Sequence, residues 1–233
     1  MSRGALPATG LRWAVAISGT AAPNALARAE RAALCDLLTE VGPDAPTLCE
    51  GWTTRDLAAH LVIRETRPDA GLGIVLAPFA SYTAKVLKDA AARPWPDLVS
   101  AVRQGPPRWA PQSIARLDAE MNTVEYFVHH EDVRRGTAPW TPRDLDAATT
   151  AELWSRVTKT ARFFTRRCKV GILARPTDGP SAGTSRRLRS GAREVTLVGP
   201  ASEILLALLG RTTLGLEIEG EAADIEQFTS FAR

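Results

Sequence analysis

Residues 123–134 read TVEYFVHHEDVR, and this stretch decides both the fold and the site that we expect. It falls inside a long helix predicted over 113–136, which the glycine at its end terminates. Glu125 and His129 are four residues apart, so on a helix their side chains project from one face and can converge on one point. His130 points about 100° away from His129, which makes it the weaker partner for Glu125.

The side of this helix that carries Glu125 is otherwise apolar. Its other members are Met121, Val124 and Val128. A carboxylate on such a face is unfavourable unless it is paired or bound to a cation. One interpretation is an ion pair with Arg64 or Arg67 across a helical bundle, and the other is a bound metal ion.

His60 belongs to a second helix, predicted over 54–67 by a capping-box pattern at its start and a proline after its end. It shares its apolar stripe with Leu57 and Leu61. Polar side chains that face inward from two helices are how bundle cores build metal sites, although a single histidine on an apolar face is more often a hydrogen-bonded core residue. Asp132 follows His129 by three residues and could orient it by hydrogen bonding.

Around these two helices the sequence predicts a mainly α protein with a small C-terminal addition. We expect a four-helix bundle over 23–167, an α+β domain over 168–233, and a disordered tail or a start codon placed too far upstream at 1–22. Further helices are predicted over 24–41, 79–92, 97–104, 145–167 with Asp144 as N-cap, 200–210 and 221–231, and strands over 169–175, 193–198 and 214–219. The Gly-, Ser- and Arg-rich stretch 177–192 is expected to be a turn or a mobile loop, and residues 181–193 are a candidate lid over the site.

The composition excludes two classes of function. The chain has 233 residues and a formal net charge of +3, which is spread along its length. The one basic cluster is Arg186, Arg187, Arg189 and Arg193. Nucleic-acid binding needs a larger clustered basic face, so we do not expect it. No apolar run approaches the ~20 residues of a membrane helix, so we expect no membrane partner either.

The cysteines indicate the compartment. Cys35, Cys49 and Cys168 are an odd number and contain no CxxC pair, which is typical of free thiols in a reducing cytosol. We therefore expect a cytoplasmic protein, a monomer or homodimer, with small-molecule partners.

Two separated motifs resemble one known family. Residues 49–61, CEGWTTRDLAAHL, are similar to the GW-x-x-x-DL-x-x-H-L segment of the mycothiol-dependent maleylpyruvate isomerase family, within the DinB/YfiT-like superfamily. Residues 123–134 resemble its second signature, E-x-x-x-H-x-x-D-x-R. Residues 64–70, RETRPDA, resemble an actinobacterial subgroup described only as metal-binding, and residues 195–203, VTLVGPASE, are similar to the family's small C-terminal domain. The resemblance covers most of residues 24–233 and implies a DinB-like four-helix bundle.

The resemblance also implies a metal site and a reaction. The family's ligands carry over to His60, Glu125 and His129, with zinc as the expected metal and nickel or iron as alternatives. Two imidazoles and one carboxylate leave a coordination position open, as in catalytic metal sites. The resemblance implies the low-molecular-weight thiol mycothiol as co-substrate. A divalent cation would deprotonate such a thiol, whose ordinary pKa is ~8.5. We expect S-transfer to a small electrophile, or its isomerisation.

Two other functions stay open. The first is a metal-binding protein without catalysis, such as a sensor or a partner-binding module of the same fold. The second is a non-haem iron oxygenase, since two histidines and one carboxylate also define that site. Such oxygenases normally use a β-barrel scaffold, so a helical sequence argues against the second.

Residues near the motifs have more than one interpretation. Cys49 is interpreted as a buried thiol rather than one near the metal. Trp52 and Tyr126 are interpreted as core aromatics. Arg134 and Arg135 are interpreted as a solvated last helical turn, with attraction of an acidic thiol or substrate as the alternative.

Overall fold

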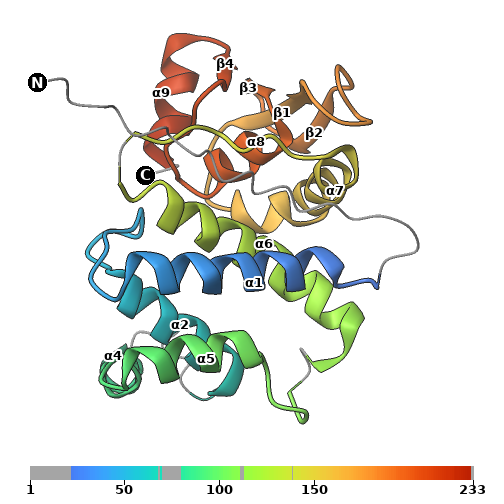
Figure 1. The fold of residues 1–233 in the computed structure, drawn as a ribbon. Helices are drawn as coiled ribbons and strands as arrows, with labels where there is room; N and C mark the ends of the chain where they lie inside the picture. The colour runs from blue at the N-terminus through green and yellow to red at the C-terminus, as the bar shows by residue number, and fades with distance from the viewer. Residues whose placement is uncertain (1–21, 68, 70–79, 111–112, 138, 232–233) are drawn as a thin grey trace, which may run out of the picture.

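Figure 1 shows the computed structural model, which describes residues 22–67, 69, 80–110, 113–137 and 139–231. In these residues the chain forms eight helices and one four-stranded sheet, which confirms a mainly α fold with a small C-terminal α+β part. The helices are α1 (Ala25–Val41), α2 (Thr54–Thr66), α4 (Ala80–Ala91), α5 (Trp95–Gln104), α6 (Ala115–Arg134), α7 (Ala147–Phe164), α8 (Ala201–Leu208) and α9 (Ala222–Phe231). The strands are β1 (Gly171–Pro176), β2 (Arg186–Arg189), β3 (Glu194–Gly199) and β4 (Glu217–Glu219).

Helices α1, α2, α5 and α6 pack around one apolar core. Its buried members include Leu34, Leu38, Leu57, Leu61, Leu98 and Tyr126. In Figure 1, α1 and α6 cross in the middle of the molecule, between the layer of α2, α4 and α5 and the sheet. The start of α2 is as predicted, because Asp56 Oδ2 accepts hydrogen bonds from the backbone N–H and the hydroxyl of Thr53, at 3.0 and 2.8 Å.

A mixed sheet with the strand order β2-β1-β3-β4 forms the C-terminal part. β1 and β3 run parallel in its centre, and β2 and β4 pair with them antiparallel at the two edges. The core under the sheet also receives side chains from α6, α7 and α8. Its buried members include Phe127, Leu153, Val157, Ile172, Val195 and Ile204. The division of the chain after residue 167 stays a prediction, because α7 buries its apolar face in this shared core.

Strand β2 lies inside the stretch 177–192, which the sequence predicts as a turn or mobile loop. The strand forms because Arg187 lies opposite Leu173 in the antiparallel pairing with β1. Long-range pairing of this kind outweighs the turn-forming composition of the surrounding residues. The predicted loop is therefore wrong for these four residues.

Several other boundaries also differ from prediction by two or more residues, and two of them have a clear physical reason. Helix α7 has Asp146, not Asp144, as its N-cap, because the Asp146 carboxylate accepts a hydrogen bond from the backbone N–H of Thr149 at 2.7 Å. Strand β4 begins at Glu217, three residues later than predicted, after Gly215 with φ at 73°. Such a left-handed residue interrupts an extended strand.

No helix in the described ranges is long and apolar enough to cross a membrane. The tail predicted at 1–22 lies outside the described residues, apart from Ala22.

Candidate metal centre

Three side chains converge between α2 and α6. His60 Nε2 lies 3.1 Å from Glu125 Oε1, and His129 Nε2 lies 3.3 Å from the same oxygen. The rings of the two histidines meet edge to face, with their centroids 5.4 Å apart. One donor atom from each of the three residues lies within 4.8 Å of the others, so the group could hold a metal ion. The fold thus brings together the residues that the sequence singles out, and their role as ligands stays a prediction.

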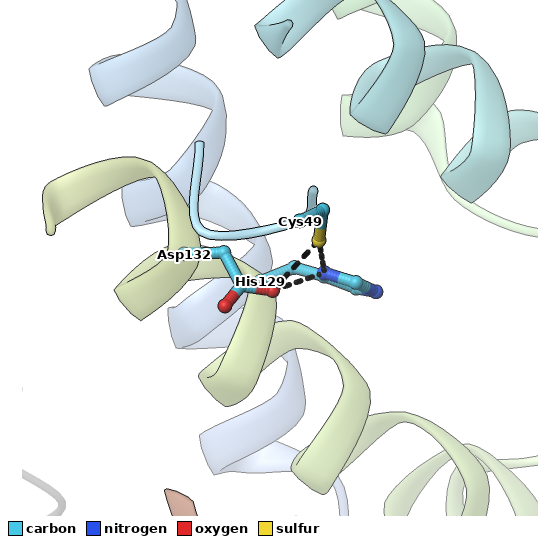
Figure 2. Close-up of side chains that lie close together, drawn as sticks. All are labelled: Cys49, His129 and Asp132. Atoms are coloured by element: carbon cyan, nitrogen blue, oxygen red, sulfur yellow. Dashed lines mark hydrogen bonds and ion pairs between the residues drawn. The ribbon is translucent and has the colours of Figure 1, made fainter. Parts of the chain in front are cut away.

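A second group of possible ligands shares His129 with the first. Figure 2 shows Cys49, from the loop before α2, pointing at His129 and Asp132 of α6. Cys49 Sγ lies 3.2 Å from Asp132 Oδ2 and 3.9 Å from His129 Nδ1, and that nitrogen lies 2.9 Å from the same carboxylate oxygen. A thiol, an imidazole and a carboxylate are also a donor set for zinc, and these three meet the same distance condition.

Arg211 distinguishes the two groups. Its guanidinium donates to both oxygens of Asp132, at 3.0 and 2.9 Å, and its Nη2 lies 3.9 Å from Cys49 Sγ. A metal ion in the second group would have to displace this cation or share the carboxylate with it. Asp132 is therefore better explained as the residue that orients His129 through Nδ1, the common arrangement behind a metal-binding imidazole.

Arg64 also contacts the first group. Its Nε lies 3.2 Å from Glu125 Oε1, so the ion pair expected between Glu125 and Arg64 is present. The two Nη groups of Arg64 are held elsewhere, by the side-chain oxygen of Asn122 and by the Met121 carbonyl. Arg67 pairs instead with Asp69, at 2.7 Å. Glu125 therefore keeps one guanidinium contact, where Asp132 has two.

Hydrogen bonds hold these residues in their charged forms. Burial opposes ionisation of Glu125, but hydrogen bonds from the two histidines and the charge of a nearby arginine hold the pKa of its carboxyl well below its usual value. Burial also opposes the imidazolium of His129, yet its bonds to Asp132, Cys49 and Glu125 raise its pKa well above the usual value. The pKa of Asp132 is lowered to about 2, because His129 and Arg211 outweigh burial.

The loop between α1 and α2 is held against the end of α6. A Cβ on Gly136 would lie 2.1 Å from the carbonyl oxygen of Pro46, so only glycine permits this close approach. Further along the same loop, the ring of Trp52 packs with its centroid 5.2 Å from that of His60. The loop thereby adds Cys49 and Trp52 to the site.

An open cavity of about 980 Å³ lies in front of the two histidines. The bundle side of its wall includes Cys49, Trp52, His60, Glu125 and His129, and the later part of the chain adds Phe164, Arg166, Leu209, Arg211 and Phe231. Nothing in the sequence motifs pointed to Arg211. It follows α8 and stands 79 residues from Asp132 along the chain, so only the folded chain brings the two together.

His130 is not part of this cavity wall, in agreement with helical geometry. Its Nδ1 lies 2.7 Å from Glu30 Oε2 in a buried pair. Arg135 is buried as well, with Nε 2.5 Å from Glu131 and Nη2 2.6 Å from Glu203 of α8. The predicted solvated turn is therefore wrong for Arg135, because the C-terminal part of the chain covers this end of α6.

Of the remaining residues singled out from the sequence, some line the cavity and others do not. Tyr126 is buried in the bundle core, as predicted. Cys49 is only half-buried and Trp52 lines the cavity, so both lie closer to the site than predicted. Arg134 pairs with Glu131 and does not line it. Of the candidate lid, 181–193, every residue is described, and none belongs to the cavity wall.

The arrangement of a helical bundle joined to a small mixed sheet is also found in a solved enzyme structure. The solved structure of mycothiol-dependent maleylpyruvate isomerase has this fold: it superposes with a TM-score of 0.55 and 19% sequence identity over 86% of this chain and 93% of that one. A variant of that enzyme with one histidine replaced by alanine gives a TM-score of 0.56 at the same identity and coverage. No protein-family profile matches the sequence, and no curated protein does. At this identity the likeness shows a shared fold.

Proposed function

We propose that His60, Glu125 and His129 bind one divalent metal ion, zinc in the first instance, and that the site conjugates or isomerises a small electrophile with the help of mycothiol. The observation that carries the proposal is the convergence of two histidine Nε2 atoms on one carboxylate oxygen, 3.1 and 3.3 Å away, at the wall of an open cavity. The shared fold with a mycothiol-dependent enzyme supports the choice of thiol.

The residues present fit such an ion. Two imidazole nitrogens and one carboxylate oxygen are a donor set of catalytic zinc sites, which keep a further position for water or substrate. The hydrogen bond from His129 Nδ1–H to Asp132 leaves the Nε2 lone pair directed at the site. His60 and Glu125 have side chains that are 20% and 23% exposed, so the site is open on its cavity side.

The surrounding residues would bind and orient the reactants. When bound, the metal ion supplies a positive charge that lowers the pKa of a thiol beside it. Arg211 and Arg166 also line the cavity and bring positive charge to it, so an acidic group on either reactant would be attracted. Trp52 closes one side of the cavity beside His60, and its ring offers a flat apolar surface to a reactant.

The principal alternative is a metal-binding protein without catalysis, such as a sensor or a partner-binding module. A purely structural zinc site is closed by four protein ligands. The open cavity beside the candidate ligands favours a reaction over that alternative. The helical scaffold continues to argue against a non-haem iron oxygenase.

The test starts from the purified full chain loaded with zinc. We expect one equivalent of metal in the wild type and a loss of stoichiometric binding in His60→Ala. His130→Gln is the matched control, since this histidine is buried beside Glu30 and outside the cavity wall, and it should keep its metal. Conjugation of a chloro-dinitro-aromatic electrophile should require both zinc and mycothiol. A wild type that holds no stoichiometric metal contradicts the proposal, whereas a metal-loaded protein without thiol transfer across several electrophiles favours the non-catalytic alternative.

A further inference from the structure

A second cavity, of about 450 Å³, lies between α6 and α7 and reaches the same candidate ligands. It shares six lining residues with the first cavity: Arg64, Glu125, His129, Phe164, Leu209 and Arg211. Six apolar side chains line it, Met121, Val124 and Val128 from α6, Phe163 and Phe164 from α7, and Leu209, whereas Glu120, Lys159 and Thr160 add polar groups that the first cavity lacks. The metal position that we propose therefore faces two spaces, one with a wall that is about equally polar and apolar and a second with a more apolar wall.

Helical spacing explains how the apolar groove leads to the metal position. Met121, Glu125 and His129 follow one another at intervals of four, so they form one row along α6. Val124 and Val128 belong to the adjacent row, also four residues apart. The groove thus runs along α6 beside the candidate ligands, with Met121 one turn before Glu125.

Exposed apolar side chains stand on both sides of this groove. Met121 on α6 is 41% exposed and Phe163 on α7 is 65% exposed. Single exposed apolar residues are ordinary on protein surfaces. These two, however, line one groove and continue inward to half-buried Val124 and buried Val128, so the apolar surface is contiguous up to the candidate ligands.

Charged residues close the outer end of the groove. Glu120 of α6 pairs with two residues of α7, Arg156 at 2.5 Å and Lys159 at 3.8 Å. The apolar part of α6 thus extends from residue 121 to residue 128. At ~1.5 Å per residue, this corresponds to a length of about 10 Å.

We propose that the electrophile handled by this site carries an extended apolar group, alkyl or aryl, about 10 Å long, which lies in the groove between α6 and α7. The inference rests on the proposed function, because it places the reactive end of the electrophile beside the metal ion. Burial of this apolar group against Met121, Val124 and Phe163 would release water from the groove. A small, doubly charged substrate would leave this apolar surface empty.

The experiment uses the zinc-loaded full chain and a series of alkyl hydroxamates, from acetohydroxamate to decanohydroxamate. The hydroxamate group binds zinc, and the alkyl chain probes the groove. Complete burial of a methylene is worth about fourfold in affinity, so in a groove open on one side we expect a gain of about twofold per added methylene. The gain should level off once the chain spans about 10 Å.

Matched variants test where the alkyl chain of the hydroxamate binds. Met121→Gln combined with Phe163→Ser should sharply reduce the gain per added methylene, because both side chains line the groove, and acetohydroxamate binding measured alongside reports whether zinc is still held. The control combines Leu117→Gln with Trp109→Ser, two residues outside the groove with nearly the same exposure, 41% and 66%, and it should keep the full gain.

The outcomes separate this inference from the proposed function. Binding of acetohydroxamate without a gain for longer chains overturns the inference alone. A gain that survives in the groove variant also overturns it, since the alkyl chain then binds elsewhere. A gain that appears only after removal of residues 1–21 overturns it as well, because another part of the protein then competes for the groove. Absence of any zinc-dependent hydroxamate binding overturns the proposed function, and this inference with it.

Discussion

His129 Nδ1 lies 2.9 Å from Asp132 Oδ2, and this hydrogen bond decides which ring nitrogen faces the cavity. The two residues are three apart on α6, so the bond is made within one turn of one helix. Because Asp132 is fully buried and also bound by Arg211, it cannot turn away. The imidazole is therefore held with Nε2 toward Glu125 before any metal ion arrives.

Replacement of this carboxylate should weaken metal binding without removing a ligand. We expect Asp132→Asn to lower zinc affinity about 10–100-fold, the usual effect of losing the group behind a metal-binding histidine. Isothermal titration with zinc and a competing chelator would measure it. Asp36→Asn changes an exposed carboxylate that pairs with Arg103 and should leave the affinity unaltered. Equal affinity for Asp132→Asn and wild type would show that Asp132 has no orienting role.

Metal binding should depend on pH through His129. Burial disfavours its imidazolium, but bonds to Asp132, Cys49 and Glu125 raise its pKa well above the usual value, so the metal-free protein carries a proton there at neutral pH. Zinc needs the Nε2 lone pair and must displace that proton. Affinity should therefore rise as pH rises toward this raised pKa, with about one proton released per metal, as measured by calorimetry in buffers of different ionisation enthalpy.

The raised pKa of His129 also makes the stability of the metal-free fold depend on pH, and here the stability falls as pH rises. A raised pKa means that the protonated imidazole stabilises the folded state fully below the ordinary histidine pKa of about 6.5, and that this stabilisation is lost as pH rises through the folded-state value. Urea unfolding of the metal-free chain at several pH values would measure this contribution. A metal affinity independent of pH across the neutral range would contradict the assignment of the proton to His129.

The three cysteines should differ in reactivity. Burial raises the pKa of Cys35 to about 11, and Cys168 is buried under the sheet, whereas Cys49 lines the open cavity. Thiolates are the reactive species, and both access and ionisation limit them. We expect a dithiobis-nitrobenzoate assay on the native protein at pH 8 to titrate one thiol rapidly, and Cys49→Ser to remove that signal. All three should react after unfolding in guanidinium, and two rapid thiols in the native protein would count against this assignment.

The buried ion pairs at the end of α6 should be essential for stability. Arg135 lies between Glu131 and Glu203, and all three are buried. Arg135→Met leaves two buried carboxylates without this partner, so we expect a loss of about 3–5 kcal/mol in urea unfolding. Arg103→Met removes a 45% exposed partner of Asp36 and should cost less than about 1 kcal/mol. Similar losses for both variants would mean that the buried pair does not hold α8 onto α6.

Local sequence patterns were sufficient for the helices and for the relation between Glu125 and His129. A capping box defined the start of α2, and a separation of four residues defined a shared helical face, because both depend on hydrogen bonds or geometry within a few residues. The same reasoning set His130 apart, and the structure places it in a separate buried pair with Glu30.

Contacts between distant parts of the chain decided the rest. Strand β2 formed where composition predicted a loop, because β1 supplied a partner for it. Arg135 became buried because Glu203 of α8 lies over the end of α6. Leu173 and Arg187 are 14 positions apart and Arg135 and Glu203 are 68 apart, so these contacts do not follow from the properties of neighbouring residues.

The sequence by itself determined that His60, Glu125 and His129 could face one another across two helices, since periodicity sets the direction of each side chain. Only the tertiary structure decided what surrounds them: Asp132 bound by Arg211 behind His129, Cys49 brought in by the loop that Gly136 allows to approach, and an apolar groove beside α6. The physical reason is that helical direction is a property of neighbouring residues, whereas charge balance and cavity shape arise from the packing of elements that meet only in the folded chain.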